Sequence, residues 1–359
     1  MAAGCAPCPV CPPPKPAPET ARYEPRGFGD LPGWSRAQLE PSLRAFIAGC
    51  ARFKRVCDIA KTVPPGDEEA ARRFFETEFV PYALISSDTG DSGLITGYYE
   101  PIIEGSRMPS AAHPHPIYGV PPDLIVVDLP ETKQMRLRGR LDGRRLVPYY
   151  SRAEIDARGE AFGAPVLAWT RDPVELFFLQ IQGSGQVQLE SGERIRVGYA
   201  DQNGHPYRSL GRYLVERGEM PLEQASMQGI KAWAAANPQK LREALHQNPS
   251  YVFFRELPPS DGPIGALGVP LHAGTSLAVD RRFVPLGAPV YLATTYPLSD
   301  MPLERLMAAH DTGGAIRGVV RADFFWGTGE HAGAHAGRMR QAARMWLLWP
   351  RGEPLPRAD

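Results

Sequence analysis

Glycine and proline interrupt this chain too often for long regular elements to form. The 359 residues include 36 glycines and 38 prolines, roughly a fifth of the chain and well above average usage. Proline ends or kinks helices and is excluded from central strands, whereas glycine marks turns and bulges. This pattern predicts many short elements joined by turns, and therefore a mainly β fold with flanking helices.

Length and charge narrow the class of protein further. A chain of this length exceeds the size at which one hydrophobic core usually stops growing, which favours two domains. The 40 basic and 40 acidic residues cancel, and no block of lysine or arginine stands out. The sequence therefore gives no electrostatic support for binding to nucleic acid or to an anionic membrane surface. No apolar run reaches the roughly 18 residues that a transmembrane helix requires.

The first residues, MAAGC followed by APCPVCPPPKPAPE, are similar to the end of a bacterial lipoprotein signal, in which Cys5 would carry the lipid. The alternative is an ordinary low-complexity tail. Seven prolines between Pro7 and Pro18 favour an extended tether over residues 1–25, with a reach on the order of 60 Å. Cys5, Cys8 and Cys11 have a spacing that occurs in metal sites, but no histidine lies near them, so no metal is predicted.

Two helices are predicted after the tether. Apolar residues follow helical spacing from Ser35 to Cys57, and Asp67 is a suitable N-cap for a second helix through Phe79. Cys50 and Cys57 would be about 10.5 Å apart in a straight helix, beyond the reach of a disulfide. A bond between them would require the helix to break, and the sequence leaves their oxidation state open.

The remainder alternates between strands and helices. Residues 92–105 and the pieces within 106–175 are rich in β-branched and aromatic residues, as in a small barrel or sandwich. Residues 177–200 are predicted as a strand, a glycine bend and a hairpin. Helices are expected at 209–217, 223–236 and 238–247, and further strands at 248–256, 276–292, 306–318 and 341–350.

The block DTGGAIRGVVRADFFWGTG separates Asp311 and Asp323 by twelve positions across a glycine-rich turn. A carboxyl beside an apolar wall can have its pKa raised enough to donate a proton near neutral pH. Phe324 and Trp326 are the expected wall beside Asp323. The alternative is that Asp311 forms a turn and Asp323 is an exposed loop acid.

A set of uncharged aromatic and amide residues suggests a carbohydrate ligand. Sugars stack on aromatic rings and accept or donate hydrogen bonds at amide side chains. Taken singly, each such residue is more often a core residue of a strand. The set consists of Tyr98, Tyr99, Gln180, Gln182, Tyr199, Asn203 and Tyr207.

Other chemistries find little support. His331 and His335 stand at helical spacing, but adjacent glycines argue against a rigid helix that would present them with His310 to zinc. Ser184 in QGSGQ lacks the spacing of a nucleophile elbow. No phosphate-binding loop or dinucleotide fingerprint is present. We therefore expect neither a metal nor a cofactor.

Six segments, in unbroken order from about residue 90 to 348, resemble one family. They are GYYEP (97–101), FFLQIQGSG (177–185), VGYADQNGHPYRSLGRYL (197–214), NPSYVFF (248–254), SLAVDRRFVPLG (276–287) and the block at 311–329. Together they resemble the membrane-bound lytic murein transglycosylase A family, with its C-terminal 3D domain. Two departures are a spacing between Asp311 and Asp323 that is one longer than in some relatives, and Thr275 where arginine is expected.

The resemblance implies two barrels with a groove between them for a glycan strand. Residues 26–104 and 246–359 would form a double-psi β-barrel, and residues 105–245 a smaller inserted β-barrel. The three acids that name the 3D domain would be Asp280, Asp311 and Asp323. The predicted substrate-binding residues are Tyr98, Tyr99, Glu100, Gln182, Ser184, Tyr199, Asn203, Tyr207, Gly313 and Gly314.

The implied reaction cleaves the β-1,4 bond between N-acetylmuramic acid and N-acetylglucosamine in peptidoglycan glycan strands. Asp323 would protonate the leaving oxygen and then take the proton of the C6 hydroxyl, which closes a 1,6-anhydro ring; Asp311 would orient Asp323 or tune its acidity. A hydrolase that uses both acids, and a murein-binding scaffold without activity, are the alternatives.

The resemblance also implies a location. Members of the family are anchored as lipoproteins at the periplasmic face of the outer membrane. This supports a lipid on Cys5 that inserts into the inner leaflet of that membrane. Murein synthases and divisome proteins are the protein partners expected there.

Overall fold

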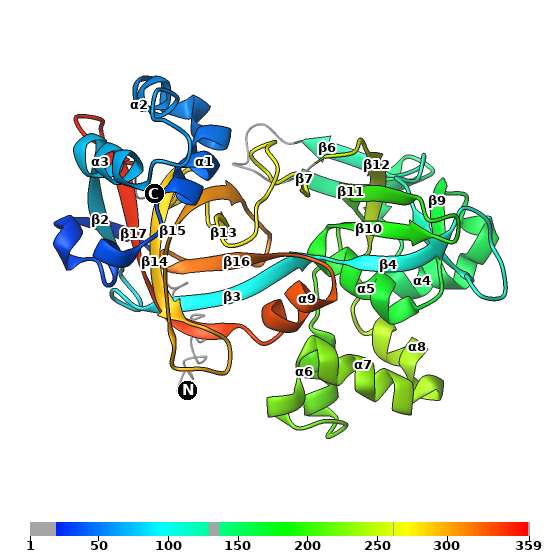
Figure 1. The fold of residues 1–359 in the computed structure, drawn as a ribbon. Coiled ribbons are helices and arrows are strands. Elements are labelled where there is room, and N and C mark those ends of the chain that lie inside the picture. The colour runs from blue at the N-terminus through cyan, green and yellow to red at the C-terminus, as the bar shows by residue number, and fades with distance from the viewer. Residues whose placement is uncertain (1–18, 129–135, 261, 358–359) are drawn as a thin grey trace, which may run out of the picture.

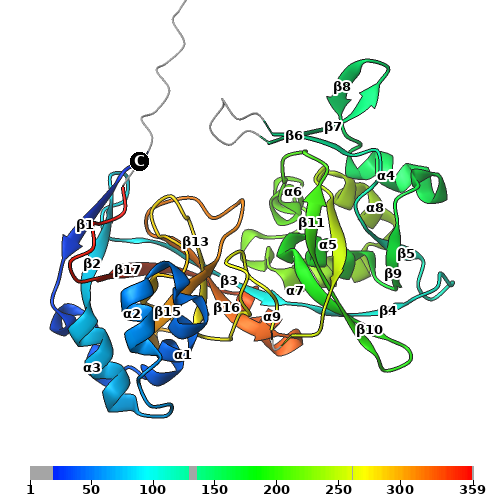
Figure 2. The ribbon, with the colours of Figure 1, turned by 90° about the horizontal axis from the view of Figure 1, so that it is seen from above.

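The computed structural model describes residues 19–128, 136–260 and 262–357. Cys5, Cys8, Cys11 and the proline-rich segment as far as Pro18 lie outside the described residues. Two β structures stand next to each other and are joined by a long strand that runs from one into the other (Figure 1). A smaller three-stranded sheet projects from the second (Figure 2).

The first β structure is a closed barrel. Its sheet has the order β1-β2-β17-β14-β15-β13-β16-β3, and β3 also pairs with β17, so six of the strands form a ring. β13 with β15 and β16 with β3 are parallel pairs. The strands are β1 (Ala21–Pro25), β2 (Phe79–Ser86), β3 (Gly93–Glu100), β13 (Ser276–Val279), β14 (Pro289–Thr295), β15 (Pro302–Asp311), β16 (Arg321–Thr328) and β17 (Arg340–Pro350). This ring of early and late strands confirms the predicted barrel.

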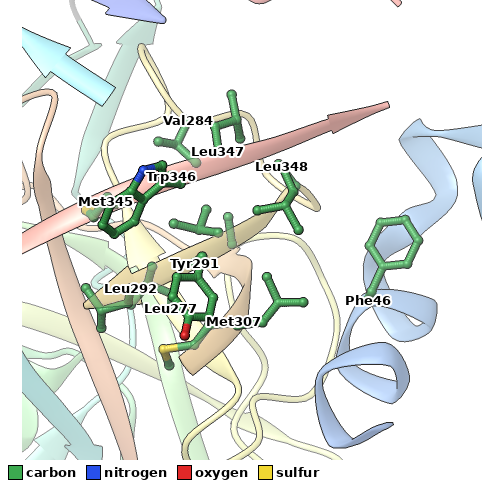
Figure 3. Close-up of a cluster of buried hydrophobic side chains, with 14 of the residues drawn as sticks. Phe46, Leu277, Val284, Tyr291, Leu292, Met307, Met345, Trp346, Leu347 and Leu348 are labelled. Atoms are coloured by element: carbon green, nitrogen blue, oxygen red, sulfur yellow. The ribbon is translucent and has the colours of Figure 1, made fainter. Parts of the chain in front are cut away.

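Apolar side chains from all sides fill this barrel (Figure 3). Leu277, Tyr291 and Leu347 are completely buried there. Phe46 extends the core toward the helices (Figure 3).

Three helices, α1 (Glu40–Gly49), α2 (Lys54–Ala60) and α3 (Glu68–Glu78), cover one side of the barrel (Figure 1). The helix predicted from Ser35 to Cys57 is broken by a single 3₁₀ turn at Cys50–Arg52. The break brings the Cα atoms of Cys50 and Cys57 to 5.3 Å, and the two residues form a disulfide. The predicted N-cap is confirmed, since the Asp67 side chain accepts a hydrogen bond from the Ala70 backbone N–H at 2.8 Å.

The second β structure has the strand order β12-β11-β10-β4-β9-β5. A bridge between Gly119 and Phe254 links its two edges and closes it into a smaller barrel. Its strands are β4 (Ile102–Ser106), β5 (His115–Tyr118), β9 (Val166–Thr170), β10 (Ser184–Leu189), β11 (Arg194–Gln202) and β12 (Val252–Leu257). The projecting sheet contains β6 (Ile125–Asp128), β7 (Arg136–Asp142) and β8 (Arg145–Pro148). The predicted inserted β-barrel is thus confirmed.

The remaining helices are α4 (Arg152–Arg158), α5 (Pro173–Gln182), α6 (Leu210–Glu216), α7 (Met227–Ala236), α8 (Pro238–His246) and α9 (Glu330–Ala336). None of the described helices is both long and apolar enough to cross a membrane. The short α9 lies next to β3 and β16 of the first barrel (Figure 1).

The strand predicted at the start of FFLQIQ is wrong, because this segment belongs to α5. Its cap residues decide the outcome: the Asp172 side chain accepts a hydrogen bond from the Val174 N–H at 2.7 Å, and Pro173 occupies the first turn. Gly183 then ends the helix in the left-handed region with φ of 78°. An apolar run alone does not distinguish a buried helix from a strand.

Strand pairing in the sheets places the borders of the tether and of the two barrels at other residues than predicted. β12 pairs with β11, so residues 252–257 belong to the inserted barrel and not to the first barrel as predicted. β4 begins at Ile102, three residues before the predicted border. β1 pairs with β2, so residues 21–25 are part of the first sheet and not of the tether.

Candidate active site

Strand alternation determines where Asp323 points. On β16 its neighbours Ala322 and Phe324 are buried in the barrel core, so the carboxylate lies on the outer face. The expected wall of Phe324 and Trp326 is therefore wrong, because these two rings face the other side and contact each other at 4.7 Å between centroids. Phe325 shares the face of Asp323.

Asp323 is held by an arginine and a threonine. Its Oδ1 atom accepts hydrogen bonds from Thr96 Oγ1 on the adjacent strand β3 and from Arg321 Nη1. Arg321 Nη2 in turn donates to Thr96 Oγ1 at 3.0 Å. The side chains of Arg321 and Asp323 are 14% and 19% exposed. Within the described residues no hydrogen bond engages Oδ2, so one carboxylate oxygen is held and the other is available.

Asp311 ends β15 and has a different environment. Its Oδ1 accepts hydrogen bonds from the backbone N–H groups of Ala266, at 2.8 Å, and Thr312, at 2.9 Å. Burial raises the pKa of the Asp311 carboxyl, the two N–H groups offset part of that rise, and the charge of Asp323 adds to it. Burial thus favours the protonated form of Asp311.

The Tyr98 side chain lies beside both acids. Burial raises its pKa well above the ordinary value, and the charges of Asp311 and Asp323 raise it further. Its ring packs on Phe325 with centroids 5.1 Å apart. The hydroxyl is buried next to Asp311. Tyr98 therefore contributes a buried polar group next to the acids rather than an open stacking surface.

Asp280, the third acid of the resemblance, has a structural environment. It is 2% exposed, and Arg282 Nη2 lies 2.6 Å from its Oδ2. Burial opposes its ionisation, but the hydrogen bonds from Arg282 and from the Gly318 backbone N–H together lower its pKa. Asp280 thereby anchors the end of the glycine-rich turn that joins Asp311 to Asp323.

Three predicted substrate-binding residues line one cavity of about 230 Å³. Tyr99, Gln182 and Tyr207 meet there with residues of α6, α7 and α9, and Gln182 Oε1 accepts a hydrogen bond from the Tyr99 N–H at 3.3 Å. Gly97 also lines this cavity, whereas Thr96 contacts Asp323. Strand β3 therefore lies between the cavity and the acids.

Glu100 and Asn203 do not reach an accessible surface. Each is 1% exposed. Glu100 Oε2 accepts hydrogen bonds from Gln186, Arg196 and Thr328. Asn203 Nδ2 donates to two backbone carbonyls. The structure thus gives these two predicted substrate-binding residues internal hydrogen-bonding roles instead.

The other predicted residues lie on the surface to different degrees. Tyr199 and Tyr207 are 44% and 52% exposed. Ser184 is half-buried at the start of β10. Gly313 is half-buried and Gly314 exposed, both in the turn that follows Asp311.

Sequence reasoning missed Arg321 and Thr96. Residues two apart on a strand share a face, so the spacing of Arg321 and Asp323 was a signal that could have revealed their pairing. Thr96 gave no such signal, because it is 227 positions from Asp323 in the chain.

The histidines considered for zinc are engaged elsewhere. His335 Nδ1 lies 3.0 Å from the His331 carbonyl, and its ring stacks on Trp326. His310 is completely buried, and burial lowers its pKa to about 4. Over the described ranges, no group of three histidine, cysteine, aspartate or glutamate residues could hold a metal ion.

Comparison with known proteins first defines the class. The family model described as the 3D domain matches residues 275–349, which include the late strands of the first barrel and all three acids. The model described as the MltA specific insert domain matches residues 94–255, which include most of the second barrel. The two models thus match both barrels in turn.

Relatives in sequence identify the family. The chain is 37% identical over 263 residues to membrane-bound lytic murein transglycosylase A of Escherichia coli K12, a match over 70% of this chain and 64% of that protein. It is 32% identical over 286 residues to the Vibrio cholerae protein of the same name, over 76% of this chain and 69% of that protein. The chain belongs to the membrane-bound lytic murein transglycosylase A family, and its match spans 64% of the E. coli relative's length.

Solved structures of the same family resemble the fold of this chain. A crystal structure of MltA from Neisseria gonorrhoeae superposes with a TM-score of 0.84 at 41% identity, covering 94% of this chain and 95% of that one. The crystal structure of E. coli MltA with bound chitohexaose superposes with a TM-score of 0.66 at 29% identity, covering 92% and 91% of the two chains.

Proposed function

We propose that this protein is a lytic transglycosylase of peptidoglycan. It would cleave the bond between N-acetylmuramic acid and N-acetylglucosamine and leave 1,6-anhydro ends. The observation that carries the proposal is the pair of acids, Asp311 and Asp323, held in unlike environments on the outer face of a 3D-domain barrel. Relatives named as lytic murein transglycosylases support the reaction class.

A β-1,4-linked amino-sugar chain is the proposed substrate. Support comes from the E. coli relative with bound chitohexaose, a chain of that chemistry. The exposed tyrosines Tyr199 and Tyr207 provide rings for stacking sugars. Gly314, exposed in the turn after Asp311, leaves room for a bulky ligand near that acid.

The proposed mechanism uses Asp323 twice. Protonated at Oδ2, it gives its proton to the glycosidic oxygen as the bond to C1 breaks. The resulting carboxylate, still bonded at Oδ1 to Arg321 and Thr96, then takes the proton of the C6 hydroxyl as that oxygen bonds to C1. Because the attacking hydroxyl is part of the same sugar, its effective molarity replaces a positioned water.

A hydrolase is the second candidate, and one observation favours it. Burial raises the pKa of Asp311, whereas Asp323 is paired with Arg321. Two acids whose environments differ in this way can act as proton donor and base. In that case Asp311 would protonate the leaving oxygen and Asp323 would activate a water.

We also propose that Cys5 attaches the chain to lipid at the periplasmic face of the outer membrane. The disulfide between Cys50 and Cys57 supports an oxidising compartment. The relatives named as membrane-bound support an envelope location. Murein synthases or divisome proteins would then be within reach as partners.

Substitution of Asp323 tests the function. Asp323→Asn should lower muropeptide release from purified murein by at least roughly 100-fold, while binding to murein sacculi in a pull-down stays unchanged. Asp300→Asn, on an exposed loop, is the matched control and should keep full activity. Wild-type turnover by Asp323→Asn would overturn the assignment, and a wild-type protein that binds murein but never releases muropeptides would be a scaffold.

A further inference from the structure

We propose that Arg321 is a positioning residue for the reaction: it fixes one oxygen of Asp323 and stabilises the carboxylate that forms when Asp323 gives up its proton. This inference rests on the function proposed above and adds a residue to it.

The geometry fixes the guanidinium from several sides. Nη1 donates both to Asp323 Oδ1 and to the Ala322 carbonyl, the latter at 2.6 Å. Nη2 donates to Thr96 Oγ1, which itself donates to Asp323 Oδ1. Arginine, threonine and aspartate thus form a closed triangle of hydrogen bonds. A planar guanidinium can make these contacts together, whereas a lysine ammonium is a single point of charge.

Burial strengthens the attraction between Arg321 and Asp323. With side chains 14% and 19% exposed, the two charges are screened far less than an exposed surface pair. The triangle uses Oδ1, so the carboxylate cannot rotate freely, and Oδ2 keeps one direction relative to the barrel. A fixed direction matters because a misplacement of about 1 Å can cost roughly 100-fold in rate.

The surrounding charges define what Arg321 must balance. The titratable groups that share this region are Asp323 and Arg321 on β16, Asp311 at the end of β15, Tyr98 on β3 and the exposed Arg340, which pairs with Thr96 from β17. Of the two arginines, Arg321 is the one that hydrogen-bonds to Asp323, and it bonds to only one of the two acids. Its positive charge therefore stabilises the carboxylate that accepts the C6 proton in the second half of the reaction.

This role predicts a specific change in the pH profile. When the cation is removed, the carboxylate formed on proton transfer is less stable. The initial rate should therefore fall, and the descending limb of its pH profile should move to higher pH. A residue that merely supports the fold would lower the rate equally at every pH.

The experiment compares full-length wild type with Arg321→Met, Arg321→Lys and Arg321→Ala on purified sacculi. Arg321→Met should lower the maximal rate of muropeptide release roughly tenfold to a hundredfold with half-saturation unchanged, and should shift the descending limb upward. Arg321→Lys should keep the descending limb of the pH profile at the wild-type pH, but its maximal rate should reach only part of the wild-type rate. Guanidinium chloride at millimolar concentration should restore part of the rate of Arg321→Ala.

Two further variants, Arg317→Met and Asp323→Asn, distinguish the possible outcomes. Arg317→Met removes an exposed arginine from the neighbouring turn and should leave both rate and profile unchanged. Wild-type rate and profile in Arg321→Met, or a loss that is equal at every pH and that guanidinium does not rescue, would overturn the inference. If Asp323→Asn is inactive in the same assay, either result would refute only the role of Arg321. The proposed function would then still stand.

Discussion

At the scale of single residues, the face of the strand decides which side chains can do chemistry. Asp323 lies between two residues that fill the barrel core, Ala322 and Phe324, yet its own carboxylate is on the outer face beside Thr96 and Arg321. The same alternation on β3 puts Tyr98 beside the acids and Tyr99 in the cavity behind the strand.

His310 gives a prediction about pH and stability. Burial lowers its pKa to about 4, and its ring nitrogens lie 2.9 Å from the Ala45 carbonyl and 2.9 Å from Ser276 Oγ. An unfolded histidine titrates near 6.5, so between these values the unfolded chain binds a proton that the folded chain does not. Stability should therefore fall as pH drops from about 6.5 to 4, by on the order of 3 kcal/mol from this residue.

Urea unfolding at a series of pH values measures this contribution. His310→Gln should show a smaller loss over the same pH range, even if it is less stable throughout. His331→Gln, at an exposed position, should behave as wild type. A wild-type stability that stays flat across the range would contradict the prediction.

At the scale of elements, helix caps and helix breaks determine where helices begin and end, which hydrophobic spacing alone does not. The spacing from Ser35 to Cys57 is helical, but the structure divides it at Cys50–Arg52. The covalent geometry of cystine made that break a condition that could be stated from sequence. The strand predicted within 177–182 is wrong for the opposite reason, because the cap at Asp172 and Pro173 begins a helix that the apolar run alone does not indicate.

The disulfide should contribute measurably to stability. Cys50 and Cys57 are 0% and 4% exposed, and closure of so short a loop corresponds to about 2 to 3 kcal/mol on the chain-entropy model. The double variant Cys50→Ala with Cys57→Ala should unfold at lower urea concentration than wild type. Reductant should lower the wild-type midpoint and leave the variant unchanged. A wild-type midpoint that is insensitive to reductant would show that the bond contributes nothing.

At the scale of the whole molecule, the two barrels meet where β3 passes into β4. Glu100 is buried at this junction and bonds to Gln186 and Arg196 of the second barrel and to Thr328 of the first. The order of motifs predicted two barrels and their nesting. It could not place the borders, because β12 joins the inserted barrel only through pairing with β11.

Glu100 should therefore matter for stability and not for substrate affinity. Glu100→Ala leaves Arg196, whose side chain is 12% exposed, without its carboxylate. Removal of one partner from a buried pair costs about 3 to 5 kcal/mol. Chemical unfolding should show this loss, while murein binding by the folded fraction stays unchanged. Glu104→Ala, exposed in the next strand, should change stability by no more than about 0.5 kcal/mol. Weaker murein binding at full stability would instead place Glu100 in the substrate site.

The central claim is that Asp323 gives one proton to the leaving oxygen and then accepts another from the C6 hydroxyl, and that this hydroxyl replaces water. The most direct test is mass spectrometry of the muropeptides that the wild-type protein releases from murein in water enriched in heavy oxygen. We predict 1,6-anhydro products without the label, and none of these products from Asp323→Asn. Reducing ends that carry the label would contradict the account and identify a hydrolase.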